Sequence, residues 1–262
     1  MSITQLLFAG ITLPEVIMDN RPIGEGGGSG TVSLGPFNVV SSTNITVTGD
    51  VDVRIRVAGA APGPSSGSYV EGTVRMYKDQ TYYLYKNSQY AALFYGANTI
   101  GAPTCILLGA QGGNSGNAAG GPAGYPSGSS GSPLNNSGGG GGGVVSGYLS
   151  GAAGGGGSRG GDPGFPADPG TPGGLFSAGS GGGGVDGSGG PGGFGYYGGG
   201  GGGGGWDSGS DYGGTFGGGG GGGASYAHGL PPSAPYPAPI SNATSGSNTG
   251  ASYMTLVSIT YI

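Results

Sequence analysis

The sequence contains very little charge. Only 7% of its residues are Asp, Glu, Lys or Arg, whereas about 25% is usual for a globular domain. The few cations are unevenly placed, because Arg159 is the only Lys or Arg that follows Lys86. Binding to nucleic acid or to an anionic membrane surface depends on clustered cations. The sequence therefore predicts neither a nucleic-acid partner nor a basic membrane-binding patch.

Residues that support catalysis or metal binding are also scarce. Cys105 is the single cysteine, which excludes an intrachain disulfide and indicates a small buried hydrophobe. His228 is the single histidine, and no phosphate-binding loop or Ser-His-acid set can be nominated. Partial matches to a calcium-binding β-roll repeat at 181–186 and 202–207 lack its apolar residue and lie too far apart. We expect no metal, no cofactor and no enzymatic activity.

The apolar runs that membrane insertion requires are absent as well. No stretch of about 18 apolar residues is present, so no transmembrane helix is expected. The segment Met1–Phe8 lacks both a basic region and a long apolar core, and so gives no indication of a secretory signal peptide. We therefore predict synthesis in a cytoplasm and no membrane insertion.

Glycine is present in large excess and is concentrated in one part of the chain. Of the 73 glycines, 14 lie in residues 1–108, 56 in residues 109–223 and 3 in residues 224–262. Short segments rich in aromatic residues and proline separate the pure glycine runs. These runs are 138–143, 154–157, 181–184, 198–205 and 217–223. The composition therefore divides the chain near Gly109 into two regions of different character.

The region before Gly109 has the hydrophobic pattern of a β-rich domain. Val51–Val57 alternates between apolar and charged residues, which is typical of a half-buried strand. A strand at Thr43–Thr48 is expected to form a hairpin with it around Gly49-Asp50. A last strand is expected at Met254–Ile262, and we expect it to return to the N-terminal domain or to pair with another protein. The other expected strands are Tyr69–Tyr77, Thr81–Tyr85, Ala91–Tyr95 and Cys105–Leu108.

The glycine-rich region cannot form an ordinary hydrophobic core, because glycine has no side chain to bury. A flexible linker is the usual interpretation of such runs, but their recurrence between aromatic segments favours an ordered structure. Polyglycine can adopt the polyproline II conformation, with three residues per turn and a rise of about 3.1 Å. Packed side by side, such helices can hydrogen-bond to one another through their N–H and C=O groups. Consecutive glycines, in place of a Gly-X-Y repeat, argue against a collagen triple helix.

A β-rich domain, pure glycine runs that alternate with aromatic-rich loops, and a final short strand together resemble the long-tail-fibre adhesins of T-even bacteriophages. The resemblance covers essentially the whole chain, and the alternation of glycine runs with loops is its specific part. It implies a receptor-recognising protein on the virion, bound to the trimeric distal protein of the long tail fibre. It also implies that loops between polyglycine II helices recognise a porin-like outer-membrane protein of a Gram-negative host and set the host range.

The resemblance assigns a role to each region of the chain. Residues 1–108 would be a β-rich fibre-attachment domain, and residues 109–250 a polyglycine II helix sandwich with connecting loops. Residues 251–262 would be a strand that returns to the attachment domain, and little α-helix is expected. The residues expected to contact the fibre are Leu6, Leu7, Phe8, Val16 and Ile17.

Loops on a rigid scaffold are where binding residues usually lie. If 109–121 is the first glycine segment to run outward, the loops 122–137, 158–180 and 206–216 fall at the far end of the stack. If 185–197 contains a further glycine segment that crosses the stack, a second set of residues lies at the far end instead. The first set is Tyr125, Phe165, Phe176, Trp206, Asp207, Tyr212 and Phe216, and the second set is Tyr196, Tyr197, Tyr226 and Tyr236.

Two other functions stay open at this point. A glycine-rich structural or ice-binding protein is one alternative, although it would need regular flat repeats and these loops are irregular. A glycan depolymerase is the other, and Asp207 and Asp211 are its only candidate pair of acids. A non-enzymatic adhesin is the hypothesis that the sequence favours.

Overall fold

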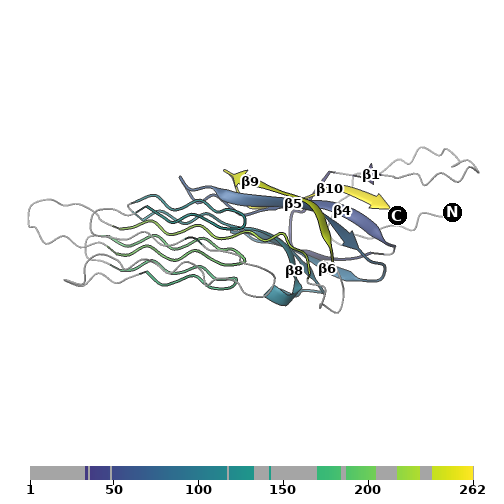
Figure 1. The fold of residues 1–262 in the computed structure, drawn as a ribbon, viewed down its shortest axis with the longest axis horizontal. Helices are drawn as coiled ribbons and strands as arrows, with labels where there is room; N and C mark the ends of the chain where they lie inside the picture. The colour runs from purple at the N-terminus through teal and green to yellow at the C-terminus, as the bar shows by residue number, and fades with distance from the viewer. Residues whose placement is uncertain are drawn as a thin grey trace, which may run out of the picture.

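The computed structural model describes residues 33–34, 36–47, 49–116, 118–132, 142, 170–183, 187–204, 217–230 and 238–261. These residues form two regions along the long axis of the molecule, a β-sandwich at one end and a bundle of extended glycine-rich segments at the other (Figure 1). The described residues contain no α-helix and one short 3₁₀ helix, η1, at Ala102–Thr104. The prediction of a β-rich fold with little α-helix is confirmed.

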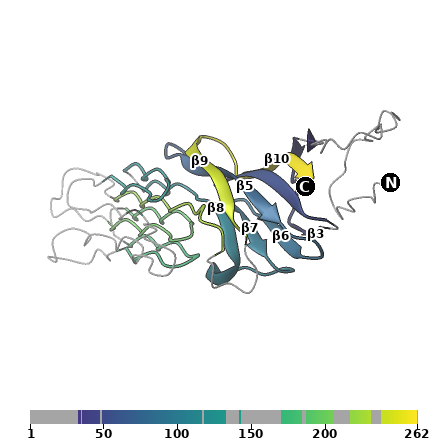
Figure 2. The ribbon, with the colours of Figure 1, turned by 45° about the vertical axis from the view of Figure 1, so that its right-hand side comes forward.

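The sandwich consists of two antiparallel sheets, seen from a second direction in Figure 2. Sheet A has the strand order β1-β10-β4-β5-β9, and β2 also pairs with β10. Sheet B has the order β3-β6-β7-β8. The strands of sheet A are β1 (Ser33–Leu34), β2 (Phe37–Asn38), β4 (Val51–Ala58), β5 (Gly67–Met76), β9 (Ile240–Asn248) and β10 (Tyr253–Tyr261). The strands of sheet B are β3 (Thr43–Thr46), β6 (Thr81–Lys86), β7 (Ala91–Tyr95) and β8 (Cys105–Gly109).

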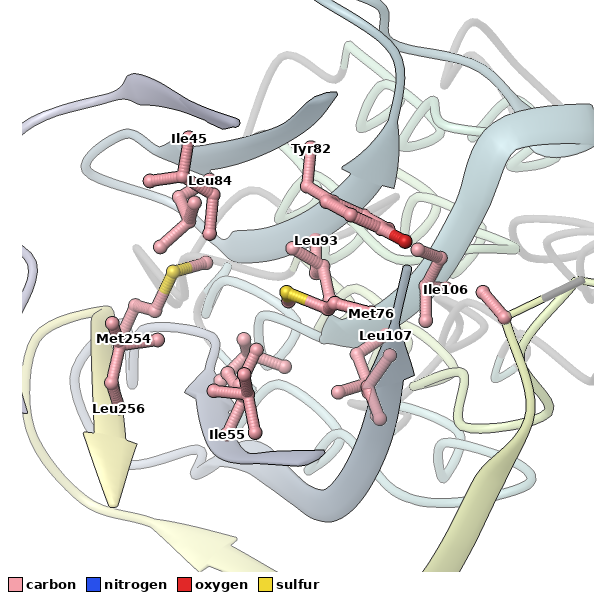
Figure 3. Packing of buried hydrophobic residues seen from close by; sticks show 14 of the residues in the cluster. Ile45, Ile55, Met76, Tyr82, Leu84, Leu93, Ile106, Leu107, Met254 and Leu256 are labelled. Atoms are coloured by element: carbon pink, nitrogen blue, oxygen red, sulfur yellow. The ribbon is translucent and has the colours of Figure 1, made fainter. Parts of the chain in front are cut away.

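The alternation of apolar and charged residues in β4 gives the strand one buried face, as predicted. Its valines and Ile55 are buried between the sheets, while its charged residues lie half-buried on the outer face of sheet A. Side chains from both sheets fill this core, including Leu84 and Leu93 from sheet B and Leu256 from sheet A (Figure 3). Each fully buried side chain of this kind contributes about 1.5–3 kcal/mol. The core therefore holds the two sheets together.

The expected hairpin around Gly49-Asp50 is wrong. β3 pairs with β6 in sheet B, whereas β4 pairs with β5 and β10 in sheet A. The chain thus crosses from one sheet to the other between β3 and β4. Apolar alternation identifies the buried face of a strand but not its neighbour, so it could not distinguish a hairpin from a crossing.

The last strand returns to the sandwich, as predicted. β10 pairs with β4, and its Met254 and Leu256 are each 1% exposed in the core. β9 returns as well and pairs with β5, so the glycine-rich region ends before β9 and not at residue 250. β9 is mostly exposed, and Ile240 is its only large apolar residue. For this reason the hydrophobic pattern did not reveal it.

Beyond β8 the chain runs back and forth in extended segments that we call rods (Figure 1). Rods 1, 3, 5 and 7 run away from the sandwich, and rods 2, 4, 6 and 8 run back toward it. Several rods consist of mixed sequence, including rod 6 within the segment 185–197. The described rods are rod 1 (110–116), rod 2 (118–124), rod 3 (127–132), rod 4 (170–174), rod 5 (177–183), rod 6 (187–194), rod 7 (198–204) and rod 8 (217–223).

Backbone hydrogen bonds between the rods repeat every third residue. Along rod 8, successive N–H groups donate to three different rods and return to the first rod after three residues. Every third residue of a chain with three residues per turn faces the same neighbour, which produces this pattern. The donor–acceptor pairs are Gly218–Gly203 and Gly221–Gly200 with rod 7, Gly219–Ser132 and Gly222–Ser129 with rod 3, and Gly220–Asn114 and Gly223–Gln111 with rod 1.

Close packing leaves room only for glycine in the interior of the bundle. Rods 7 and 8, which come from two pure glycine runs, are buried along their whole described length. In rod 6, Ser188 and Pro191 are exposed and the two glycines between them are buried. A Cβ on Gly220 would lie less than 3.0 Å from the carbonyl of Pro191. The glycine runs of rods 7 and 8 are therefore innermost, and the surrounding rods place their larger residues outward. The described part of the run 181–184 lies in rod 5, where Gly182 is buried and Gly183 is exposed. Of the other runs, 154–157 and all of 138–143 except Gly142 lie outside the described residues.

The substitution Gly202→Ala tests this packing in rod 7. Its Cβ would lie less than 3.0 Å from the backbone carbonyl of Gly218, so we expect a loss of at least about 2 kcal/mol in the free energy of unfolding. For a chain of this size that loss lowers the melting temperature by about 4–8 °C. Gly250→Ala is the matched control, because the nearest atom to its Cβ, Asn248 Oδ1, is 3.8 Å away. Equal melting temperatures for the two variants would contradict the packing.

Candidate binding surfaces

Aromatic side chains from both regions meet on the outer face of sheet B, at the end of the rods nearest the sandwich. We call this cluster the aromatic junction. β7 contributes Phe94, and Tyr90 lies directly before β7. The end of rod 6 contributes Phe194, and the turns between rods contribute Phe176 and Tyr196. The Phe94 and Phe176 ring centroids are 5.9 Å apart, and the Tyr90 ring stacks on Phe194 at 6.2 Å. The junction thus fixes the rods onto the sandwich.

Tyr226 lies at the centre of the aromatic junction. Its ring stacks on Tyr196, with centroids 4.1 Å apart and 10° between the planes. Its hydroxyl donates to the carbonyl of Gly229 at 3.1 Å, and its backbone exchanges two hydrogen bonds with Leu108 of β8. Burial raises the pKa of Tyr196 to about 12, so this phenol stays neutral. The junction is consequently an apolar contact and offers no acid or base near neutral pH.

The structure corrects the expected position of Tyr125 and Phe176, which lie beside the sandwich and not at the far end of the bundle. Tyr125 packs against the sandwich core, and its hydroxyl oxygen is 3.4 Å from Nε2 of His228. The segment 109–121, expected to be one outward rod, holds rod 1 and the start of rod 2, and the segment 158–180, expected to be a loop, holds rod 4. Rods 2 and 4 run back toward the sandwich. Their turns therefore fall at the sandwich end. Three residues of the second set lie beside the sandwich too, namely Tyr196, Tyr197 and Tyr226.

The other nominated residues lie outside the described part of the chain. Of the loop residues, these are Phe165, Trp206, Asp207, Tyr212, Phe216 and Tyr236. Of the expected fibre contacts, they are Leu6, Leu7, Phe8, Val16 and Ile17.

The far end of the bundle is where the rods end away from the sandwich. Hydrogen bonds join Gly218 to Gly203 and Gly182 to Gly202, so the outer ends of rods 5, 7 and 8 lie at one level. A further bond joins Gly219 to Ser132 and brings rod 3 to the same level. The chain leaves the described rods here at the positions 132, 183 and 204. Segments that connect these rods are thus attached to one end of a hydrogen-bonded platform.

The outer face of sheet A holds a buried ion-pair network. Glu71 on β5 is 3% exposed and accepts hydrogen bonds from Nε of Arg54 and Nε of Arg56 on β4, each 2.5 Å long. The Arg56 guanidinium also lies 4.9 Å from the ring centroid of Tyr69. Burial by itself raises the pKa of Glu71, but the two guanidinium groups outweigh it and hold this pKa below 4.5. Glu71 therefore ties β4 to β5 as a carboxylate.

A shallow cleft of about 290 Å³ lies on the same face of sheet A. Arg75 closes one side of it and donates two hydrogen bonds to Asp52, from Nε at 2.5 Å and from a terminal nitrogen at 3.1 Å. The two charges neutralise each other, which leaves no free carboxylate between them for acid–base chemistry. The cleft is lined by Asp52, Thr73, Arg75, Tyr77, Pro239, Ile240 and Ser241.

Groups with catalytic potential are few among the described residues. Cys105 is fully buried, and burial raises the pKa of its thiol. Burial lowers the pKa of His228, whose ring packs against the rings of Tyr125 and Tyr226. The described ranges contain no group of three His, Cys, Asp or Glu residues that could hold a metal ion. In the same ranges no helix is long and apolar enough to cross a membrane.

Comparisons with known proteins identify no relative. Neither a scan against protein-family models nor a search of curated proteins found a match.

Truncating a stacked ring tests the aromatic junction. Tyr196 is 8% exposed, and Tyr196→Ala is expected to lower the free energy of unfolding by about 3 kcal/mol, because a large buried ring is lost. Leu175→Ala in the neighbouring turn is the control, since Leu175 is 44% exposed and its truncation should cost less than about 0.5 kcal/mol. Chemical denaturation measures both values. A Tyr196 variant as stable as the control would refute the role of the junction.

Glu71 is expected to make the free energy of unfolding depend on pH. The pKa of Glu71 is lowered on folding, so its contribution to stability is fully present above the unfolded-state pKa and is lost as pH falls through the folded-state pKa. In Glu71→Gln this contribution is missing at every pH. The stability difference between wild type and variant should therefore be largest at pH 7 and shrink below about pH 4.5. Urea denaturation at pH 7, 5, 4 and 3 measures it, and a difference that grows toward low pH would contradict the assignment.

Proposed function

We propose that this protein is a receptor-binding adhesin at the tip of a bacteriophage long tail fibre. In this function the segments attached to the far end of the rods recognise an outer-membrane protein of a Gram-negative host, porin-like in kind, and set the host range. The observation that carries the proposal is the common level at which rods 3, 5, 7 and 8 end away from the sandwich. A platform of this kind holds several connecting segments together at one end.

In this proposal the rods are polyglycine II helices packed as a sandwich. The three-residue repeat of the hydrogen bonds supports this conformation. The lack of space for a Cβ at interior glycines supports it as well. Helices held by backbone bonds on several sides resist bending, which keeps the recognition segments in a fixed arrangement. Pre-organisation of this kind lowers the entropic cost of binding.

The segment 205–216 is the central recognition element in this proposal. It connects Gly204 of rod 7 to Gly217 of rod 8, and these two rods are the most deeply buried of those described. Its sequence contains Trp206, Tyr212 and Phe216, and rigid aromatic side chains are frequent hot spots of protein recognition. Asp207 is the acid next to the tryptophan and completes the set of residues that we assign to receptor contact in this segment.

The sandwich is the fibre-attachment part in this proposal. β10 runs away from the rods and ends at the opposite end of the molecule (Figure 1). A trimeric distal fibre protein bound at that end would leave the far end of the rods pointing toward the host cell. The assembly would then be located at the tip of the long tail fibre of the virion, after synthesis in the host cytoplasm.

The test measures binding of the labelled protein, joined to its fibre tip, to Gram-negative cells that lack single outer-membrane proteins. Loss of binding in one deletion strain, restored by complementation, is the expected result and identifies the receptor. Trp206→Ala should weaken binding at least about 30-fold, the loss that a hot spot of about 2 kcal/mol implies. Leu175→Ala should bind like wild type. Binding should change little between low and high salt, because the recognition segments carry few charges.

Three outcomes of this test would count against the proposal. Binding that no deletion affects would move recognition from a protein to lipopolysaccharide. Folded protein that binds no cells would refute the adhesin and favour a structural or ice-binding role. Lipopolysaccharide cleavage that Asp207→Asn abolishes would favour a depolymerase.

A further inference from the structure

The described rods fall into two halves according to their hydrogen bonds. Rods 1–3 bond to one another in sequence and form the first half, and rods 4–7 do the same and form the second half. Among the described residues, only rod 1 and rod 6 exchange direct backbone bonds between the halves. These bonds run from Asn114 to Pro191 at 2.9 Å and from Gln111 to Phe194 at 2.8 Å.

Within the described residues, rod 8 supplies the other backbone connections between the halves. Its N–H groups donate hydrogen bonds to rods 1 and 3 of the first half and to rod 7 of the second half. Its carbonyl groups accept hydrogen bonds from the N–H groups of Gly121 and Gly124 in rod 2, and from those of Gly190 and Gly193 in rod 6. Rod 8 is fully buried among these neighbours. Without it, their N–H and C=O groups would face an empty channel, and unpaired buried backbone groups are strongly unfavourable.

The chain that follows rod 8 completes the sandwich. Ser225 accepts a hydrogen bond from the N–H of Ala110 at 2.8 Å, and Tyr226 pairs with Leu108 along the edge of β8. β10 then lies between β4 and the short strands β1 and β2 inside sheet A. Rod 8 and β10 of the segment 217–261 therefore occupy central positions, whereas its β9 forms an edge of sheet A. The segment follows all the other described elements in the sequence.

We propose that residues 217–261 are the closing segment of the fold. The two halves of the bundle and the sandwich reach their native arrangement only when this segment docks. Rod 8 bonds to residues of the first half that lie 87 to 112 positions earlier in the sequence, and such long-range contacts form late in folding. A chain that lacks this segment consequently cannot form the far-end platform. The platform therefore forms only after this segment has been synthesised. The inference rests on the hydrogen bonds and does not depend on what the far end binds.

A matched pair of full-length variants tests the proposal. Gly220→Ala places a Cβ less than 3.0 Å from Pro191 of the second half, while the N–H and C=O of Gly220 bond to Asn114 and Gly121 of the first half. Gly181→Ala makes an equally close contact, but with Gly189 inside the second half alone. Hydrogen exchange followed by mass spectrometry reads the protection of each rod separately.

The expected result is a loss of protection in both halves for Gly220→Ala, by at least tenfold in exchange rate. For Gly181→Ala the loss should be confined to rods 4–7. Deprotection of both halves by Gly181→Ala, or of one half only by Gly220→Ala, would overturn the proposal.

Wild-type protein provides a second measurement if Gly220→Ala fails to fold. Native-state exchange in increasing urea gives an opening free energy for each amide. The amides of rod 8 should have opening free energies at least as high as those of rods 1–3 and of rods 4–7, because both halves open whenever rod 8 undocks. Rod 8 amides that open at lower urea concentrations while either half stays protected would refute the closing segment.

Discussion

The absence of Cβ atoms from the interior of the bundle is the constraint on which the rest of this structure depends. Without side chains, rods approach until N–H and C=O groups of one meet those of the next, and the three-residue repeat directs these groups to several neighbours in turn. An ordinary core is held by apolar surface, whereas this bundle is held by satisfied backbone groups. The positions of the other residue types in the described bundle follow from this, because only the outer rods have room for a side chain.

A bundle of this kind has no hydrophobic surface of its own with which to fold, so its attachment to the sandwich is decisive. The aromatic junction supplies that attachment, with Tyr196 and Tyr226 stacked over the outer face of sheet B. The aromatic residues near the sandwich thus hold the structure together. In the proposed function, recognition is assigned to the segments attached at the opposite end of the hydrogen-bonded platform. This division of roles is what makes a host-range function physically reasonable.

The sequence predicted the strands better than their pairing, and the rods better than their direction. The alternation of Val51–Val57 revealed β4, but the same pattern could not show that β3 belongs to the other sheet. β9 was missed because its side chains are mostly polar and exposed. Tyr125 and Phe176 were expected at the wrong end because the glycine pattern did not separate rod 1 from rod 2 and did not distinguish rod 4 from a loop. These rods are of mixed sequence and were not recognised from pure glycine runs. A search for Gly-Gly-X spacing, as in Gly189-Gly190-Pro191, would also have found rod 6.

The central claim is that successive glycines of one rod bond to different neighbours, and NMR couplings through hydrogen bonds test it most directly. In labelled protein, the N–H groups of Gly218, Gly219 and Gly220 should couple to the carbonyl carbons of Gly203, Ser132 and Asn114 respectively. The same three rods should recur in the same order for the next three residues. Couplings that alternate between two neighbours, as in a β-sheet, or the absence of any coupling with random-coil chemical shifts, would contradict the account.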